Sequence, residues 1–122
     1  MSKARVGLGN VMITLDAREY TLVPTLAAAQ GVSRISGGIR GAIDAIIKLD
    51  IDVVTRIVQL GLGPKVTKEI GPGLPDLIWQ SGLTDSGGEL AAKCIEYLTM
   101  LSNGGRPIIP EARDDSDDPQ IS

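Results

Sequence analysis

The chain has 122 residues, of which 43% are hydrophobic, and it contains one cysteine, no histidine and no phenylalanine. Histidine titrates near neutral pH and is the commonest metal ligand, so its absence excludes a Ser-His-Asp triad, a histidine-bearing zinc site and an imidazole proton relay built from this chain alone. We therefore predict a protein that is not an enzyme, has no cofactor and no metal site, and acts by contacting other proteins.

The formal net charge of −3 is unevenly distributed. Residues 111–122 contain five acids and one base, a net charge of −4, which leaves 11 bases and 10 acids in the other 110 residues. Neither part has the concentrated basic surface that a phosphate backbone requires. The only aromatic side chains are Trp79, Tyr20 and Tyr97, so base stacking and sugar binding are disfavoured as well. We expect no nucleic-acid partner.

The length supports one domain with one aliphatic core. Cys94 has no second cysteine with which to form a disulfide, which favours a reducing compartment. We find no signal-peptide pattern near Met1, and no apolar run approaches the ~20 residues that span a bilayer. The expected protein is soluble and cytoplasmic, without membrane contact.

Residues 1–10 are small, basic and glycine-containing, and they are predicted to form a flexible arm. Residues 11–15 and 20–23 are rich in β-branched or aromatic side chains and flank a polar stretch, which predicts a β-hairpin. A two-stranded ribbon is marginal in water, so helices must cover one of its faces.

Pro24 ends the second predicted strand, and Thr25 is a suitable N-cap for a helix that begins at Leu26. Asp44 and Lys48 form an i, i+4 pair on a second predicted helix. The apolar face of that second helix has helical spacing and consists of Ile39, Ile43, Ile46 and Ile47.

Asp52 is expected to cap a third helix, which stops at the glycine- and proline-containing stretch 61–64. Residues 64–75 contain three prolines and two glycines and are predicted to be mostly loop. Pro75 is expected at the first position of a short helix that ends near Gln80.

Ser86 and Glu89 have the spacing of a capping box for a last helix. The apolar stripe of that helix consists of Leu90, Cys94, Tyr97, Leu98 and Leu101. Residues 103–122 begin with a glycine-containing helix stop and are predicted to form an acidic disordered tail. The predicted fold class is α+β, mostly α, with an N-terminal β-hairpin packed on four to five short helices in a single domain over residues 11–102.

Several patterns partly resemble known chemical sites, and we interpret each of them as a structural feature. The stretch 61–65, Gly-Leu-Gly-Pro-Lys, lacks the spacing of a phosphate loop, and its proline has no N–H for a phosphate. The acidic run 114–118 lacks the glycine and the terminal glutamate of a calcium loop. Cys94 lies on an apolar stripe and is interpreted as a buried hydrophobe rather than a reactive thiol. Asp50 and Asp52 are interpreted as helix caps rather than an acid–base pair.

Trp79 has two interpretations. The burial of large aromatic side chains favours a place in the core, whereas the enrichment of tryptophan among binding hot spots favours an interface anchor. The core position is preferred and the interface stays open. If this segment binds a partner, the partner-binding residues are Leu77, Ile78, Trp79 and Leu83.

Residues 15–25 read Leu-Asp-Ala-Arg-Glu-Tyr-Thr-Leu-Val-Pro-Thr. An alanine-rich helix follows, then a glycine-containing break at residues 36–39, a helix with a Gly-Leu-type stop over residues 57–63 and a last helix over residues 90–101. This hairpin and order of elements resemble the tail assembly chaperones of long-tailed phages, which begin with a hairpin of the type Leu-Asp-x-x-x-Tyr-Thr-Leu-x-Pro-Thr. The chain looks most similar to the branch found in gene transfer agents and related prophages, whose members are sometimes labelled tail tube proteins. Its hairpin turn has Ala17-Arg18 where that family often has Asp-Gly.

The resemblance implies a non-enzymatic assembly factor that binds the helical tape measure protein during tail morphogenesis and keeps it soluble until tail tube subunits polymerise around it. The implied partners are the tape measure protein and, as a second candidate, the tail tube protein, with self-association along the partner in the cytoplasm of a bacterial host cell. The alternative is a structural tail component, such as a tube-associated or connector subunit, that is retained in the particle. A small regulatory or enzyme-accessory domain that binds a host protein is a further alternative.

Overall fold

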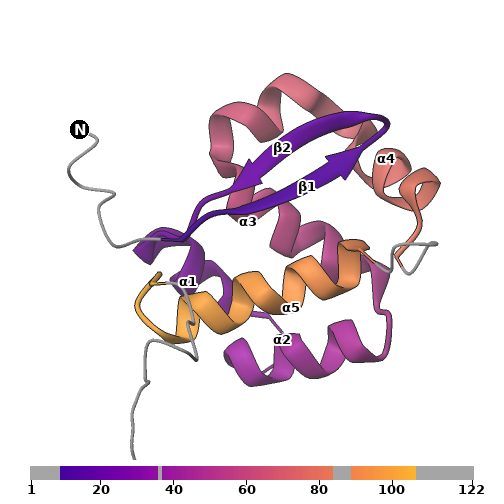
Figure 1. Ribbon diagram of the computed structural model, residues 1–122. Helices are drawn as coiled ribbons and strands as arrows, with labels where there is room; N and C mark the ends of the chain where they lie inside the picture. Colours follow the sequence, from indigo (N-terminus) through magenta and orange to yellow (C-terminus); the bar gives the residue numbers. More distant parts are fainter. Residues whose placement is uncertain (1–8, 36, 84–88, 107–122) are drawn as a thin grey trace, which may run out of the picture.

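The computed structural model describes residues 9–35, 37–83 and 89–106 (Figure 1). Residues 1–8 of the predicted arm, Ser86 of the predicted capping box and residues 107–122 of the predicted tail lie outside the described residues. The elements in chain order are β1 (Val11–Leu15), β2 (Arg18–Leu22), α1 (Leu26–Ser33), α2 (Gly38–Ile47), α3 (Ile51–Ile70), a 3₁₀ turn (Gly71–Gly73), α4 (Leu74–Ser81) and α5 (Glu89–Ser102). The fold is α+β and mostly helical, with an N-terminal hairpin, as predicted.

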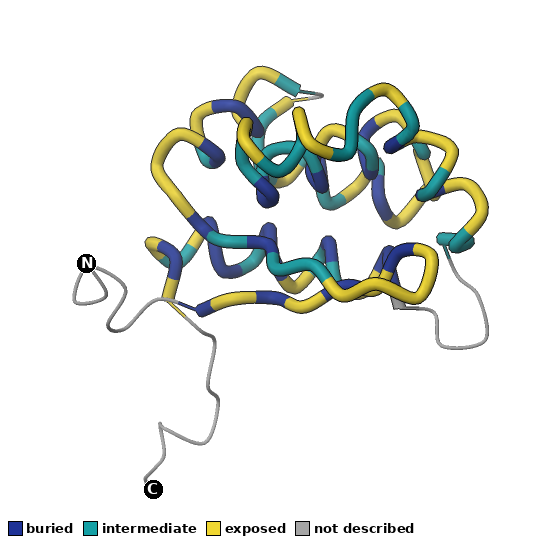
Figure 2. Tube along the Cα trace, turned by 90° about the horizontal axis from the view of Figure 1, so that it is seen from above, coloured by how far each residue is buried: buried dark blue, intermediate teal, exposed yellow. Residues whose placement is uncertain are grey.

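The hairpin lies against the helices through one of its faces. β2 contacts α3, and β1 contacts α5 and α4 (Figure 1). Buried and exposed positions alternate along β1 (Figure 2), as expected for a strand with one face on a core. The residues buried on the inner face are Val11, Ile13, Leu15 and Leu22. The predicted need for helices to cover one face is confirmed.

The hairpin turn consists of Asp16 and Ala17, because Leu15 pairs with Arg18 in the antiparallel register. Both turn residues have positive φ, 53° and 66°, as a type I′ turn requires. The second strand therefore begins at Arg18, two residues earlier than the predicted start at residue 20, so Arg18 lies in the strand and not in the turn.

The first two helices follow the sequence closely. α1 begins at Leu26, and Thr25 caps it because its Oγ1 accepts a hydrogen bond from the Ala28 N–H at 3.0 Å. On α2, Ile46 is fully buried whereas Ile47 is 63% exposed, so the predicted four-residue face loses its last member. The other two members, Ile39 and Ile43, are half-buried and pack against the core.

The third helix breaks where its stop was predicted, but the chain returns to a helix directly after the break. α3 extends from Ile51 to Ile70 as two helical segments, and Asp50 rather than Asp52 is its N-cap. Gly63 interrupts it with φ 88° and ψ 164°, and Pro64 then starts a second helical segment, because the first turn of a helix does not need the N–H that proline lacks. The 3₁₀ turn and α4 also have a proline near their start. The predicted loop over residues 64–75 is therefore mostly helical.

α5 follows its prediction. All five residues of its predicted apolar stripe are buried: Leu90, Cys94, Tyr97, Leu98 and Leu101. The helix ends where Gly104 and Gly105 adopt positive φ, and the Gly105 N–H donates to the Met100 carbonyl at 2.8 Å. The Gly9 N–H then donates to the Gly105 carbonyl at 2.7 Å, so the two ends of the described chain lie side by side.

Candidate partner-binding surface

The residues that were weighed as candidate chemical sites have structural roles. The Asp50 carboxylate accepts hydrogen bonds from the backbone N–H groups of Asp52 and Val53, which is a helix cap. Burial raises the pKa of the Cys94 thiol to about 12, so at neutral pH this side chain is a neutral, unreactive part of the core. Within the described ranges, no three histidine, cysteine, aspartate or glutamate side chains gather in a way that would hold a metal ion.

The four predicted partner-binding residues do not form one surface. Ile78 is fully buried, so its prediction as a contact residue is wrong: it faces the core from α4. Leu77 and Leu83 are half-buried and pack against the same core. Trp79 is 72% exposed, which overturns the preferred core position and leaves it as a single exposed aromatic side chain.

The structure has a groove that we did not predict from the sequence. It lies around the first turn of α1, at the opposite end of the molecule from α4 in Figure 1, and it consists of two adjoining hollows. Its larger hollow has a volume of about 850 Å³ and lies between α1, the end of β2 and the bend of α3. The apolar residues that line this hollow are Val23, Ala27, Ala28, Leu60, Leu62 and Pro64. Its charged lining residues are Arg56 and Lys68, both basic.

A smaller hollow of about 420 Å³ adjoins the first, since Thr25 lines both. Its other lining residues are Pro24, Leu26, Ala29, Leu101, Gly104 and Gly105. Leu26 is 73% exposed, the largest exposed fraction among the large apolar side chains of the described residues. We call the two hollows together the α1 groove.

The bend at Gly63 makes the larger hollow. A helix end leaves carbonyls without helical donors, and here other groups supply them. The Thr67 Oγ1 donates to the Gln59 carbonyl at 3.2 Å, and the Val23 N–H donates to the Gly61 carbonyl at 2.9 Å. The first bond joins the two segments of α3 across the bend, and the second holds the bent helix against the end of β2. Glycine at position 61 is required, because a Cβ there would lie 2.8 Å from the Leu22 Cβ.

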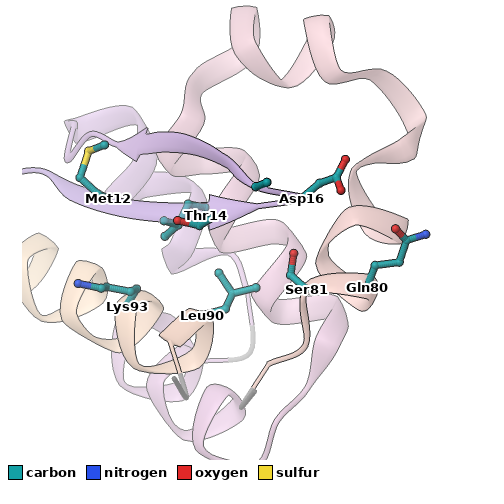
Figure 3. Close-up of a pocket in the computed structure, with 9 residues that line it drawn as sticks. Met12, Thr14, Asp16, Gln80, Ser81, Leu90 and Lys93 are labelled. Carbon is teal, nitrogen blue, oxygen red and sulfur yellow. The ribbon is translucent and has the colours of Figure 1, made fainter. Parts of the chain in front are cut away.

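A third hollow of about 560 Å³ lies at the other edge of the hairpin, between β1, the end of α4 and the start of α5 (Figure 3). Its lining includes Asp16, Gln80 and Lys93, and it is therefore more polar than the α1 groove. The Ser81 Oγ is buried beside it and has no hydrogen-bond partner among the residues that the structure describes. The open edge of β1 carries Met12 and Thr14 into this hollow.

The signal that points to the α1 groove is the same stretch that predicted a helix stop. Gly61, Gly63 and Pro64 end one helical segment, and Pro64 also begins the next, which the spacing of these residues alone does not distinguish. The exposure of Leu26 could not be predicted from apolar spacing, because Leu26 lies at the first position of a helix that is otherwise rich in alanine.

No protein-family model, no curated protein and no solved structure matches the chain. None of the helices that the structure describes has both the length and the apolar composition needed to cross a bilayer.

Proposed function

We propose that this protein is a tail assembly chaperone of a phage or gene transfer agent, which binds the tape measure protein in the cytoplasm of the bacterial host during tail morphogenesis. The observation that supports the proposal most is the α1 groove, an apolar hollow of about 850 Å³ flanked by the exposed Leu26. The hairpin sequence over residues 15–25 adds the resemblance to that family.

The groove suits an apolar helix. Helix-in-groove recognition seats side chains from successive turns in an apolar hollow, and it needs no reactive groups. Alanine and glycine line much of the larger hollow, so bulky side chains of a partner have room there. Arg56 and Lys68 stand beside the apolar lining and favour a partner helix with acidic residues along one flank.

The experiment is co-expression with the tape measure protein of the same phage or gene transfer agent, followed by a pull-down of the soluble fraction. Ala27→Glu places a larger, charged side chain in the groove at an exposed helical alanine. We expect it to abolish capture because the side chain fills part of the hollow and its carboxylate competes with the partner for Arg56 and Lys68. Ala92→Glu is the matched control, since Ala92 is an exposed alanine on α5, and it is expected to capture as the unmodified chain does.

The outcomes separate the function from the surface. If the unmodified chain does not capture the tape measure protein, the proposed function is wrong. If Ala27→Glu captures as well as Ala92→Glu, the groove is not the contact, and Trp79→Ala then tests the exposed side chain of α4.

The structural-component alternative makes a different prediction for purified particles. A chaperone leaves before the particle is complete, whereas a tube-associated or connector subunit is present at a fixed number of copies. Quantitative mass spectrometry of purified tails decides between them, and stoichiometric amounts of this chain would contradict the chaperone proposal.

A further inference from the structure

The α1 groove lies where the described chain ends. Gly104 and Gly105 line its smaller hollow, and Arg106 is the last described residue. The segment that follows therefore starts at the groove. Its sequence is Pro-Ile-Ile-Pro over residues 107–110, followed by five acids and one base over residues 111–118.

The segment is apolar first and acidic afterwards, and the groove is apolar first and basic afterwards in the same direction. The smaller hollow, nearest Gly105, has a mainly apolar lining, to which Pro24, Leu26 and Leu101 contribute. The larger hollow beyond it has Arg56 and Lys68 as its charged lining residues. Neither of these bases lies within ion-pair distance of a carboxylate among the described residues, where the pairs are Asp44–Lys48 and Lys93–Glu96.

The reach is sufficient. Twelve residues of extended chain span up to ~40 Å, and the radius of gyration of a domain of ~100 residues is ~13 Å. A segment tethered at the groove also has an effective concentration on the order of millimolar, so a weak contact is enough to keep it bound.

We propose that residues 107–118 of the same chain occupy the α1 groove in the free protein, with Ile108 and Ile109 in the smaller hollow and the acidic run against Arg56 and Lys68. A partner helix that binds the groove displaces this segment. The segment thus covers an apolar surface until the partner arrives, which limits association of the free protein with other apolar surfaces. The contact within the chain does not depend on the function proposed above, whereas its displacement by a partner helix rests on that function.

The test is paramagnetic relaxation on the full-length, ¹⁵N-labelled chain with a nitroxide attached at position 116 of the Ser116→Cys variant. Cys94 does not take the label, because it is buried and its thiol is protonated. We expect the amide signals of Ala27, Leu60 and Lys68 to be lost and those of Asp16 and Gln80, at the other end of the molecule, to be kept. No loss at the groove, or equal loss at both ends, overturns the proposal.

Two charge-reversal variants test the electrostatic part. Arg56→Glu with Lys68→Glu removes the basic lining, whereas Arg40→Glu with Lys48→Glu changes the net charge equally on α2. The first pair is expected to restore the groove signals, and the second pair is expected to leave them lost. Restoration by both pairs, or by neither, contradicts a contact with Arg56 and Lys68.

A mixture of two samples completes the test: ¹⁵N-labelled chain without nitroxide, and chain that carries the nitroxide but no ¹⁵N. Signal loss at the groove in this mixture would mean that the segment of a second copy occupies it, and the intramolecular proposal would be wrong. Unchanged signals in the mixture, together with loss in the single-chain sample, support it.

Discussion

The hairpin with α5 and the bent region around Gly63 are built in different ways. In the first, apolar side chains recur at the period of the strand or helix and face one core: Ile13 from β1 and Leu98 from α5 are both buried. In the second, a backbone conformation decides the outcome. Gly63 turns the chain with φ 88°, Pro64 restarts the helix, and an apolar hollow is left open beside them. Apolar side chains at a regular spacing fill the core, whereas the bend at Gly63 leaves an apolar hollow open to solvent.

Val23 joins the two regions through its backbone. Its N–H donates to the Gly61 carbonyl at 2.9 Å, and its carbonyl accepts from the Tyr97 hydroxyl at 2.8 Å. One residue at the end of β2 therefore connects the bent helix to α5. The groove is held on the core by two hydrogen bonds that involve no side chain of the groove itself.

The largest effect is expected from crowding the bend. Gly61→Ala places a Cβ 2.8 Å from the Leu22 Cβ, and overpacking of this kind costs about 1–3 kcal/mol in the free energy of unfolding. Gly73→Ala is the control, because its added Cβ meets no atom within 4 Å. Urea denaturation measures both variants. Equal stability of the two would show that the bend is not tightly packed against β2.

A smaller effect is expected from cutting the connection to α5. Tyr97→Phe keeps the buried ring but removes the hydroxyl that donates to the Val23 carbonyl, which costs about 1 kcal/mol. Amide hydrogen exchange of Val23 adds a second measurement, since a looser β2 end is expected to exchange faster. Unchanged stability and exchange would mean that α5 holds the hairpin by apolar contacts alone.

The smallest effect has the opposite sign. Ala17 has φ 66°, a conformation that is unfavourable for a residue with a Cβ, so Ala17→Gly is expected to stabilise the hairpin by about 0.5–1 kcal/mol. Ala92→Gly on the exposed side of α5 is the matched control and is expected to destabilise by about 1 kcal/mol. Thermal denaturation compares them, and a loss of stability in both would exclude strain at the turn.

The periodic elements could be predicted from the sequence alone. β1 matches its predicted bounds, α5 matches within one residue at each end, and all five residues of the α5 stripe are buried. Each of these elements buries one face on a common core. The spacing of its apolar residues therefore indicates which residues are buried.

The bend and the groove could not be predicted in this way. A proline after a glycine is compatible with a helix stop and with a helix start, and here both occur, because Gly63 ends one helical segment and Pro64 begins the next. The same limit applies to α4, where Ile78 and Trp79 are adjacent apolar residues on a short helix. Tertiary contacts put Ile78 in the core and leave Trp79 in solvent.

The hydrogen bond between Gly9 and Gly105 has a practical consequence. An affinity handle or reporter fused to either terminus is connected to the fold through Gly9 or Gly105, beside the α1 groove. The loop between β1 and β2 is the better insertion point, since Asp16 and Ala17 are exposed at the far end of the ribbon. Two reporters attached next to Gly9 and Gly105 would, conversely, report on each other at close range.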